Sequence, residues 1–275
     1  METFSQWLIY APLWQVAVAV LAGLILSAIV GSWLRHRVGD DHAPSSEEEG
    51  YVLGAISGLL ALLIGFTFSL AIERFDARRD RVLQEAQTIQ TAYLKAQVLG
   101  EPNRMEISNL LIAYTDNRIA LGGARPGKER DHLAAKNEKL LTQIWSGALA
   151  AFPTVKSLDF SSSFLDTMSN IMEMDAARKE GRRAHVPGRV YAILFIYEIV
   201  AAAIFGYVLT GRRGRQIAGL LLLLFAMSML LVIDLDRPAT GRINESQDAM
   251  IQLSATLHAR PPPVFGSLYP AGRGP

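Results

Sequence analysis

The chain has 275 residues, half of them apolar, and a formal charge of +1 at pH 7. It has no cysteine, which excludes disulfides, thiolate metal sites and cysteine catalysis. Its basic residues are not interleaved with aromatic residues and match no docking motif, so we do not expect nucleic acid as a partner.

Four apolar segments are each long enough to cross a bilayer. A transmembrane helix needs about 20 mostly apolar residues, with about 17 as the lower limit. Backbone in lipid must satisfy its own hydrogen bonds, so these segments are predicted to be helical. We therefore expect an all-α integral membrane protein rather than a soluble enzyme. The four segments are Val16–Leu34, Val52–Ile72, Val190–Leu209 and Ile217–Ile233.

The spans divide the chain into four predicted parts. We expect an N-terminal transmembrane hairpin over residues 1–74 and a cytosolic helical region over 75–189. A C-terminal transmembrane hairpin follows over 190–236, and residues 237–275 form a short helix and a tail. Basic residues crowd both ends of the middle region, which is typical of the cytoplasmic side. This places both termini in the cytoplasm. The start of the chain has no basic n-region, so no cleaved signal peptide is expected.

The second span is predicted to continue beyond the membrane as one long helix. Glu47, Glu48 and Glu49 precede it in a polar, turn-rich loop, and no Gly or Pro occurs between Phe66 and Leu99. Beyond the span, apolar residues alternate at four- and three-residue spacing, which indicates a narrow helix–helix seam. The seam residues are Val82, Ala86, Ile89, Tyr93 and Ala96.

Further helices are predicted along the cytosolic region. Met105–Leu121 has one apolar face, and a helix near Arg130–Ala151 is expected to end before Pro153. Ser161 or Ser162 is a candidate N-cap for the next helix. After the fourth span, Asn244–Leu257 is a candidate amphipathic helix, and the Pro- and Gly-rich tail after it is expected to be disordered.

A stripe of small residues lies along one face of the second span. Such stripes let helices in lipid approach closely, and packing against another span of the same chain is one interpretation. The other is that the helix lines a pore in an oligomer. Gly58, Leu62 and Phe66 would then form the neck, with Leu62 and Phe66 as apolar rings that exclude water. Gly58 lies at the border between the stripe of small residues and the face that would line the pore. The packing residues are Gly54, Ala61 and Gly65.

Charged residues at the membrane are candidate functional positions. Glu198 is the one charged residue within the four spans, and an intramembrane carboxylate marks a functional or interface position by default. A single interhelical hydrogen bond and a role in permeation both remain open for it. Glu73, Arg74 and Arg78 lie at the membrane–cytosol boundary. We interpret both arginines first as structural anchors and second as gating or ion-contact residues.

No enzyme motif is present. The five histidines are scattered without metal-ligand spacing, and neither GxSxG nor a phosphate-binding GxxxxGK occurs. We therefore expect neither an enzyme nor a bound cofactor or metal.

A distinctive pattern ends the second span, and a weaker one follows the fourth. The first consists of Gly65, Phe66, Ser69, Glu73, Arg74, Phe75 and Arg79, and the second of Asp236, Arg237, Pro238 and Gly241. Together with the order of spans, these patterns resemble the bestrophin family, in particular its bacterial members, often catalogued as a domain of unknown function. Phe75 and Asp76 stand where bestrophins usually carry two Trp. The acid-rich calcium clasp of animal bestrophins is missing.

The resemblance implies a homo-oligomeric ring, pentameric in bestrophins, that conducts inorganic ions through a central hydrophobic neck. It also implies the bacterial inner membrane as the location. Glu47, Glu48 and Glu49 would lie at the outer mouth, where a ring of carboxylates favours cations. A solvated loop that merely ends a helix is the alternative for these three residues.

Two other classes of function remain open. One is a non-conducting membrane scaffold or sensor whose cytosolic helices bind a partner. The other is a transporter, although the usual internal repeats and discontinuous spans are missing.

Overall fold

The computed structural model describes residues 7–8, 11–38, 46–156, 159–237 and 245–268. The regular elements in this part of the chain are all helices, which confirms the predicted all-α class. The chain divides into two compact units. Unit 1 contains residues 1–75 and 184–244, and unit 2 contains residues 76–183 and 245–275.

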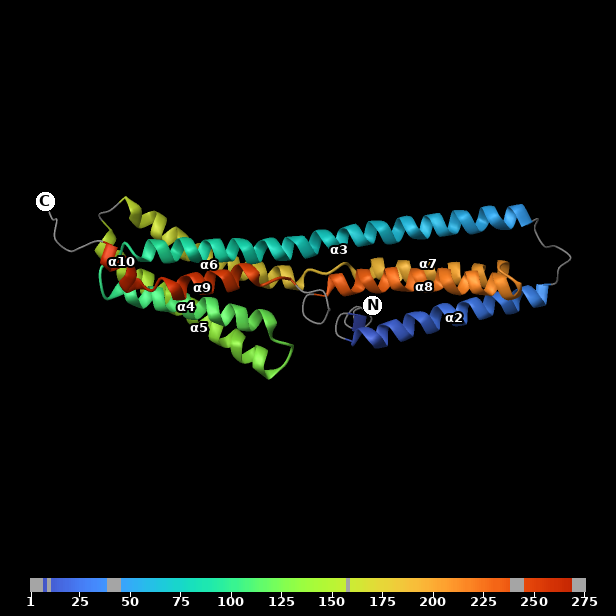
Figure 1. Cartoon of the computed structure of the whole chain (residues 1–275), viewed down its shortest axis with the longest axis horizontal. Coiled ribbons are helices and arrows are strands. Elements are labelled where there is room, and N and C mark those ends of the chain that lie inside the picture. The colour runs from blue at the N-terminus through green and yellow to red at the C-terminus, as the bar shows by residue number, and fades with distance from the viewer. Residues whose placement is uncertain (1–6, 9–10, 39–45, 157–158, 238–244, 269–275) are drawn as a thin grey trace. The chain divides into compact units, whose positions relative to one another are not determined.

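Unit 1 holds the four predicted spans, each in its own helix (Figure 1). The helices are α2 (Leu13–Val38), α3 (Ser46–Ala96), α7 (Gly188–Val208) and α8 (Gly211–Asp236), and α3 continues into unit 2. Each has a stretch long and apolar enough to cross a membrane. Helix α2 packs along α7 and α8, and large apolar side chains remain exposed on all four helices.

Helices α2 and α7 approach closely at two glycines. A Cβ at Gly31 would overlap the carbonyl oxygen of Ala203 on α7, and a Cβ at Gly206 would overlap the carbonyl oxygen of Ala28 on α2. Near this contact, the Ser27 hydroxyl donates to the carbonyl of Ile199 at 2.6 Å. Small residues thus allow the close helix packing expected within a bilayer. The close contact is between α2 and α7, whereas the sequence pattern indicates it on the second span.

The Gly31→Ala substitution should destabilise the protein. The added methyl group has no room against the Ala203 backbone, and forcing extra volume into a packed interface costs about 1–3 kcal/mol. Thermal unfolding in detergent measures the loss. Gly23→Ala on the same helix is the matched control, because a Cβ there meets nothing within 4 Å. An equal loss in both variants would contradict this packing.

Helix α3 is continuous from Ser46 to Ala96, as the absence of Gly and Pro after Phe66 predicts. In unit 2 its five predicted seam residues are all buried in one apolar core. The seam prediction is therefore confirmed.

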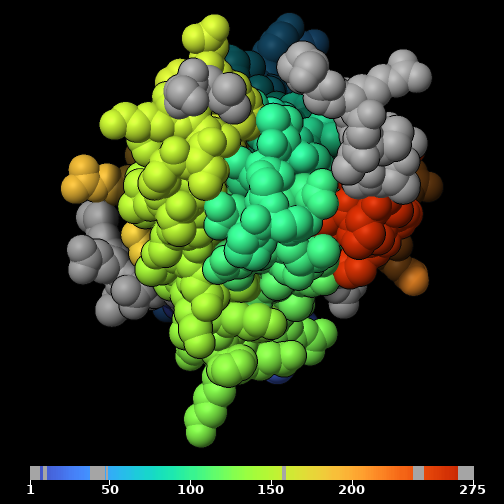
Figure 2. All heavy atoms as spheres, turned by 90° about the vertical axis from the view of Figure 1, so that its left-hand side faces the viewer, coloured from blue at the N-terminus to red at the C-terminus, as the bar shows by residue number. Residues whose placement is uncertain are grey.

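Unit 2 surrounds this part of α3 with α4 (Asn103–Gly123), α5 (Lys128–Val155), α6 (Phe160–Arg183), α9 (Asp248–Ala259) and α10 (Pro262–Leu268). Helix α4 packs on α5, α9 and α10, and α5 packs on α6. Figure 2 looks onto the end of unit 2, where the teal segment near residue 100 lies between the yellow-green start of α6 and the red α10. On these two sides Lys95 donates to Ser163, and Tyr93 donates to the carbonyl of Arg260 at 2.8 Å.

Several predicted helix boundaries in unit 2 were wrong. Pro153 lies inside α5, which continues to Val155. A proline in the last turn costs few backbone hydrogen bonds, so the helix tolerates it. Helix α6 begins at Phe160, so Ser161 and Ser162 lie within it rather than capping it. Helix α9 begins later than predicted, at Asp248, and Asn244 lies outside the described residues.

The tail prediction was also wrong for part of its length. Residues Pro262–Leu268 form α10, with proline in the first turn, where its missing N–H is not needed. Phe265 packs its ring edge-on against Tyr93, with 6.3 Å between ring centroids. Residues 269–275 lie outside the described part.

Candidate functional site

The membrane part of α3 has two contrasting faces. Leu60 and Ile64 are 1% and 8% exposed and belong to the apolar core of unit 1. Leu62 and Phe66, which the sequence predicts as neck residues, are 54% and 63% exposed. The helix therefore uses one face to pack within its own chain and presents the other, with large apolar side chains, outward.

The small-residue stripe of α3 is not packed within the chain. A Cβ built at Gly54, Gly58 or Gly65 meets no heavy atom of the described chain within 4 Å, and Ala61 is exposed. The described residues thus give no support to packing against another span of the same chain. Packing against a second copy stays a prediction.

The start of α3 is tied to neighbouring helices in unit 1. The Arg35 guanidinium pairs with Glu49 at 3.2 Å and donates to the carbonyl of Tyr207 at 3.0 Å. The loop predicted for Glu47–Glu49 was wrong, because α3 begins at Ser46 and these residues form its first turn. Glu47 is exposed, and the side chain of Glu48 lies outside the described part of the structure. One of the three predicted mouth carboxylates is therefore held in an ion pair.

The predicted boundary residues differ in burial. Glu73 is exposed and Arg74 is half-buried. Arg78 is buried in unit 2, with its Nε 4.0 Å from the carboxylate of Glu245. That burial fits the interpretation of Arg78 as a structural anchor.

Glu198 is buried within α7 at 1% exposure. Neither of its carboxyl oxygens has a hydrogen-bond partner among the described residues. The hydroxyl groups of Tyr191 and Tyr197, which are close to Glu198 in the sequence, therefore make no hydrogen bond with it. The interhelical hydrogen bond has no support within one chain, and a role in permeation or at an interface stays a prediction.

Asp236 and Arg237, from the second motif, fasten chain segments inside unit 1. Asp236 accepts hydrogen bonds from the backbone N–H of Val186 at 3.0 and 3.1 Å, just before α7 begins. Arg237 donates to the carbonyls of Leu8 and Ala11. Pro238 and Gly241 lie outside the described residues. The described residues contain no cluster of three or more His, Asp or Glu suited to hold a metal ion.

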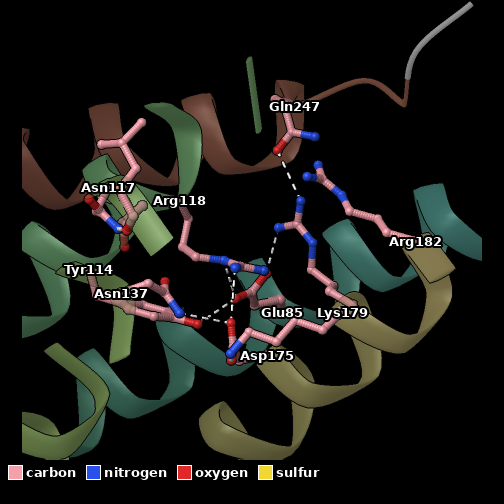
Figure 3. Close-up of polar contacts among 12 residues, drawn as sticks. Glu85, Tyr114, Asn117, Arg118, Asn137, Asp175, Lys179, Arg182 and Gln247 are labelled. Atoms are coloured by element: carbon pink, nitrogen blue, oxygen red, sulfur yellow. Dashed lines mark hydrogen bonds and ion pairs between the residues drawn. The ribbon is translucent and has the colours of Figure 1, made fainter. Parts of the chain in front are cut away.

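A cluster of buried charges in unit 2 was not predicted from the sequence (Figure 3). Glu85 of α3 is fully buried and lies between two arginines, Arg118 of α4 and Arg178 of α6. Its carboxylate is 2.8 Å from Arg118 Nε and 2.6 Å from Arg178 Nη1, and it accepts a 2.7 Å hydrogen bond from the Tyr114 hydroxyl. Three helices are thereby joined through one carboxylate.

The cluster extends to α5 and to the segment before α9. Asp175 accepts hydrogen bonds from Arg118 and Asn137, each at 2.9 Å. Arg178 donates to Gln247 at 3.3 Å, and Arg182 donates to Glu245 at 2.9 Å. The sequence contained one indication of this buried cluster, namely Glu85, because a carboxylate there interrupts the apolar seam between Val82 and Ala86.

Burial and neighbouring charges together set the protonation states of Tyr114 and Arg118, which both come from α4. Burial and the neighbouring Glu85 carboxylate together raise the pKa of Tyr114 well above its ordinary value, so its phenol remains a hydrogen-bond donor. Burial, the largest single influence, would lower the pKa of Arg118. Glu85, Tyr114 and Asp175 together outweigh burial and raise this pKa. The Glu85–Arg118 contact is therefore a true ion pair.

Comparison with known proteins agrees with this architecture. A family model described as the Bestrophin-like domain matches residues 16–250. A variant of a bacterial bestrophin homolog from Klebsiella pneumoniae aligns over 94% of this chain and 99% of that chain, with a TM-score of 0.69 and 13% identity. A second variant aligns over 90% and 98%, with a TM-score of 0.66 and 14% identity.

No curated protein matches the sequence significantly. At such low sequence identity, the solved structures establish only the shared fold. The family model, which matches most of the chain, establishes membership of the family. The resemblance read from the residues that end the second span is thus confirmed. The chain is an integral membrane protein that belongs to the bestrophin-like family.

Proposed function

We propose that this protein is an ion channel of bestrophin type, built as a homo-oligomeric ring with α3 lining the conduit. The carrying observation is the contrast between the faces of α3. Leu60 and Ile64 are buried inside the chain, whereas Leu62 and Phe66 point outward. Membership of the bestrophin-like family supports an ion channel in general.

The open glycines of α3 support contact between copies. A large apolar side chain in a membrane can face lipid as well as a pore, so exposure of Phe66 alone does not decide between them. Gly54 and Gly65 leave open space beside this face of α3, which suits the backbone of a neighbouring helix. If neighbouring copies fill that space, the adjacent Leu62–Phe66 face turns toward a shared axis. These two residues, with Gly58, then form the hydrophobic neck.

The direct test is conduction by the purified protein in planar bilayers. We expect the parent protein to carry current across a range of voltage, pH and ion composition. A parent that never conducts under these conditions, although inserted and folded, would contradict the channel assignment.

We further propose a weak preference for cations, the inner membrane as location and cytoplasmic termini. In a ring, each carboxylate of Glu47–Glu49 is multiplied by the number of subunits, which raises the local cation concentration. The basic residues at both ends of 75–189 support the orientation.

Replacing all three of Glu47, Glu48 and Glu49 by Gln should shift the reversal potential in a salt gradient toward anions. The reason is loss of negative potential at the outer mouth. Bi-ionic and gradient measurements in planar bilayers give the shift, with Glu129→Gln, an exposed carboxylate of α5, as the control. An unchanged reversal potential in the triple variant would remove the proposed cation preference.

A non-conducting scaffold is the second candidate. In unit 2, Leu94 of α3 and Val98, just after the end of α3, are 50% and 61% exposed, which suits contact with a partner protein. A monomeric size in detergent, together with absence of current, would favour this candidate over the channel.

A further inference from the structure

A small cavity in unit 2 adjoins the buried charge cluster. Its volume is about 110 Å³, and α4, α5 and α6 form its walls. Five of the eight lining residues are cationic and none is acidic. The cationic residues are Arg118, Arg130, Arg178, Lys179 and Arg182.

The carboxylates near this cavity do not balance its positive charge. Among the described residues, four carboxylates pair with four of the five lining cations. Arg130 donates to the backbone carbonyls of Leu121 and Ala124 at 3.3 and 3.0 Å instead of to a carboxylate. Positive charge is therefore in excess around a semi-enclosed space. The four carboxylates are Glu85, Glu138, Asp175 and Glu245.

We propose that this cavity binds a doubly charged tetrahedral oxyanion, either inorganic phosphate or the phosphoryl group of a small soluble metabolite. Guanidinium groups present planar pairs of N–H donors that match phosphate oxygens. The volume lies below the about 300–1,000 Å³ of sites that enclose a drug-sized molecule, so the cavity accommodates the anionic group itself. The proposal does not depend on whether the protein conducts ions.

The anion would lie against a network whose cations come from three helices and which also reaches the segment before α9. Arg118 comes from α4, Arg130 from α5 and Arg182 from α6, and Arg182 also holds Glu245 before α9. A ligand that binds this folded arrangement, and not the unfolded chain, raises the stability of the protein by mass action. Stability therefore serves as a readout that requires no channel activity.

The test uses the full-length protein in detergent, with thermal unfolding and calorimetric titration in sodium phosphate or sodium chloride at equal ionic strength and pH. Ala134 lines the cavity, so Ala134→Glu places a carboxylate where the anion would bind. Ala135→Glu, one residue further on an exposed position, is the matched control. A second pair is Arg182→Gln against Arg125→Gln, because Arg125 is exposed and does not line the cavity.

We expect phosphate to raise Tm in the parent, in Ala135→Glu and in Arg125→Gln. We expect binding to weaken at least about tenfold in Arg182→Gln and to vanish in Ala134→Glu, which should itself unfold at a higher temperature than Ala135→Glu without phosphate. A parent that shows no phosphate-specific binding, or control variants that lose it equally, would overturn the proposal. Glycerol phosphate distinguishes the two possible ligands. It should bind if the site accepts the phosphoryl group of a metabolite, and it should not bind if the site accepts inorganic phosphate alone.

Discussion

Phe66→Ala and Leu62→Ala should each increase the current through the reconstituted protein. In a ring, one substitution removes an apolar side chain from every copy at the same level of the neck. A wider, less apolar constriction is easier to wet, and wetting lowers the barrier to ions. A barrier lower by about 1.4 kcal/mol raises the rate of passage about tenfold, and we expect an increase of at least this order for Phe66→Ala. Planar-bilayer recordings at matched protein density measure it.

Leu220→Ala provides the control for these substitutions. Leu220 is 58% exposed on α8, a helix that the proposal does not place at the neck. Its replacement by Ala therefore removes an apolar side chain similar to that of Leu62, but away from the conduit. Its current should equal that of the parent. Equal currents in Phe66→Ala, Leu62→Ala, Leu220→Ala and the parent would contradict the assignment of the neck to α3.

Glu85→Ala should cause the largest loss of stability among single substitutions in unit 2. Without this carboxylate, the buried guanidinium groups of Arg118 and Arg178 lose the partner that lies 2.8 and 2.6 Å away. Breaking a buried ion pair by removing one member costs about 3–5 kcal/mol, because an uncompensated charge remains inside. At about 2–4 °C per kcal/mol for a domain of 150–250 residues, Tm should fall by roughly 10 °C.

Glu138→Ala is the matched control for Glu85→Ala. Glu138 pairs with Lys179 at the surface, and its side chain is 63% exposed, so the expected loss is about 0–1 kcal/mol. Thermal unfolding of both variants in the same detergent gives the comparison. A Glu85→Ala variant as stable as Glu138→Ala would show that the charge cluster contributes little to the fold.

The spans and the long α3 helix could be predicted because their causes are local. An apolar run of about 20 residues leaves few structures open in a bilayer, and the stretch after Phe66 has neither Gly nor Pro to end a helix. The seam from Val82 to Ala96 was likewise visible from its spacing.

Other features depend on contacts between residues far apart in the chain. Helix α10 forms in a proline-rich segment where Phe265 packs on Tyr93, and the tail sequence alone does not contain that contact. The charge cluster joins Glu85, Arg118 and Arg178, which come from three helices. A glycine stripe on α3 was visible in the sequence, but close packing inside the chain occurs at Gly31 and Gly206. Which glycine meets a neighbour depends on how the helices pair.

The arrangement of copies is the central claim, and a cryo-EM map of the purified protein in lipid nanodiscs tests it most directly. The account predicts a closed ring in which Leu62 and Phe66 of every copy face a common axis, with Gly54 and Gly65 against the adjacent copy. A map that places these two side chains against lipid, with no axial conduit beside them, would contradict it.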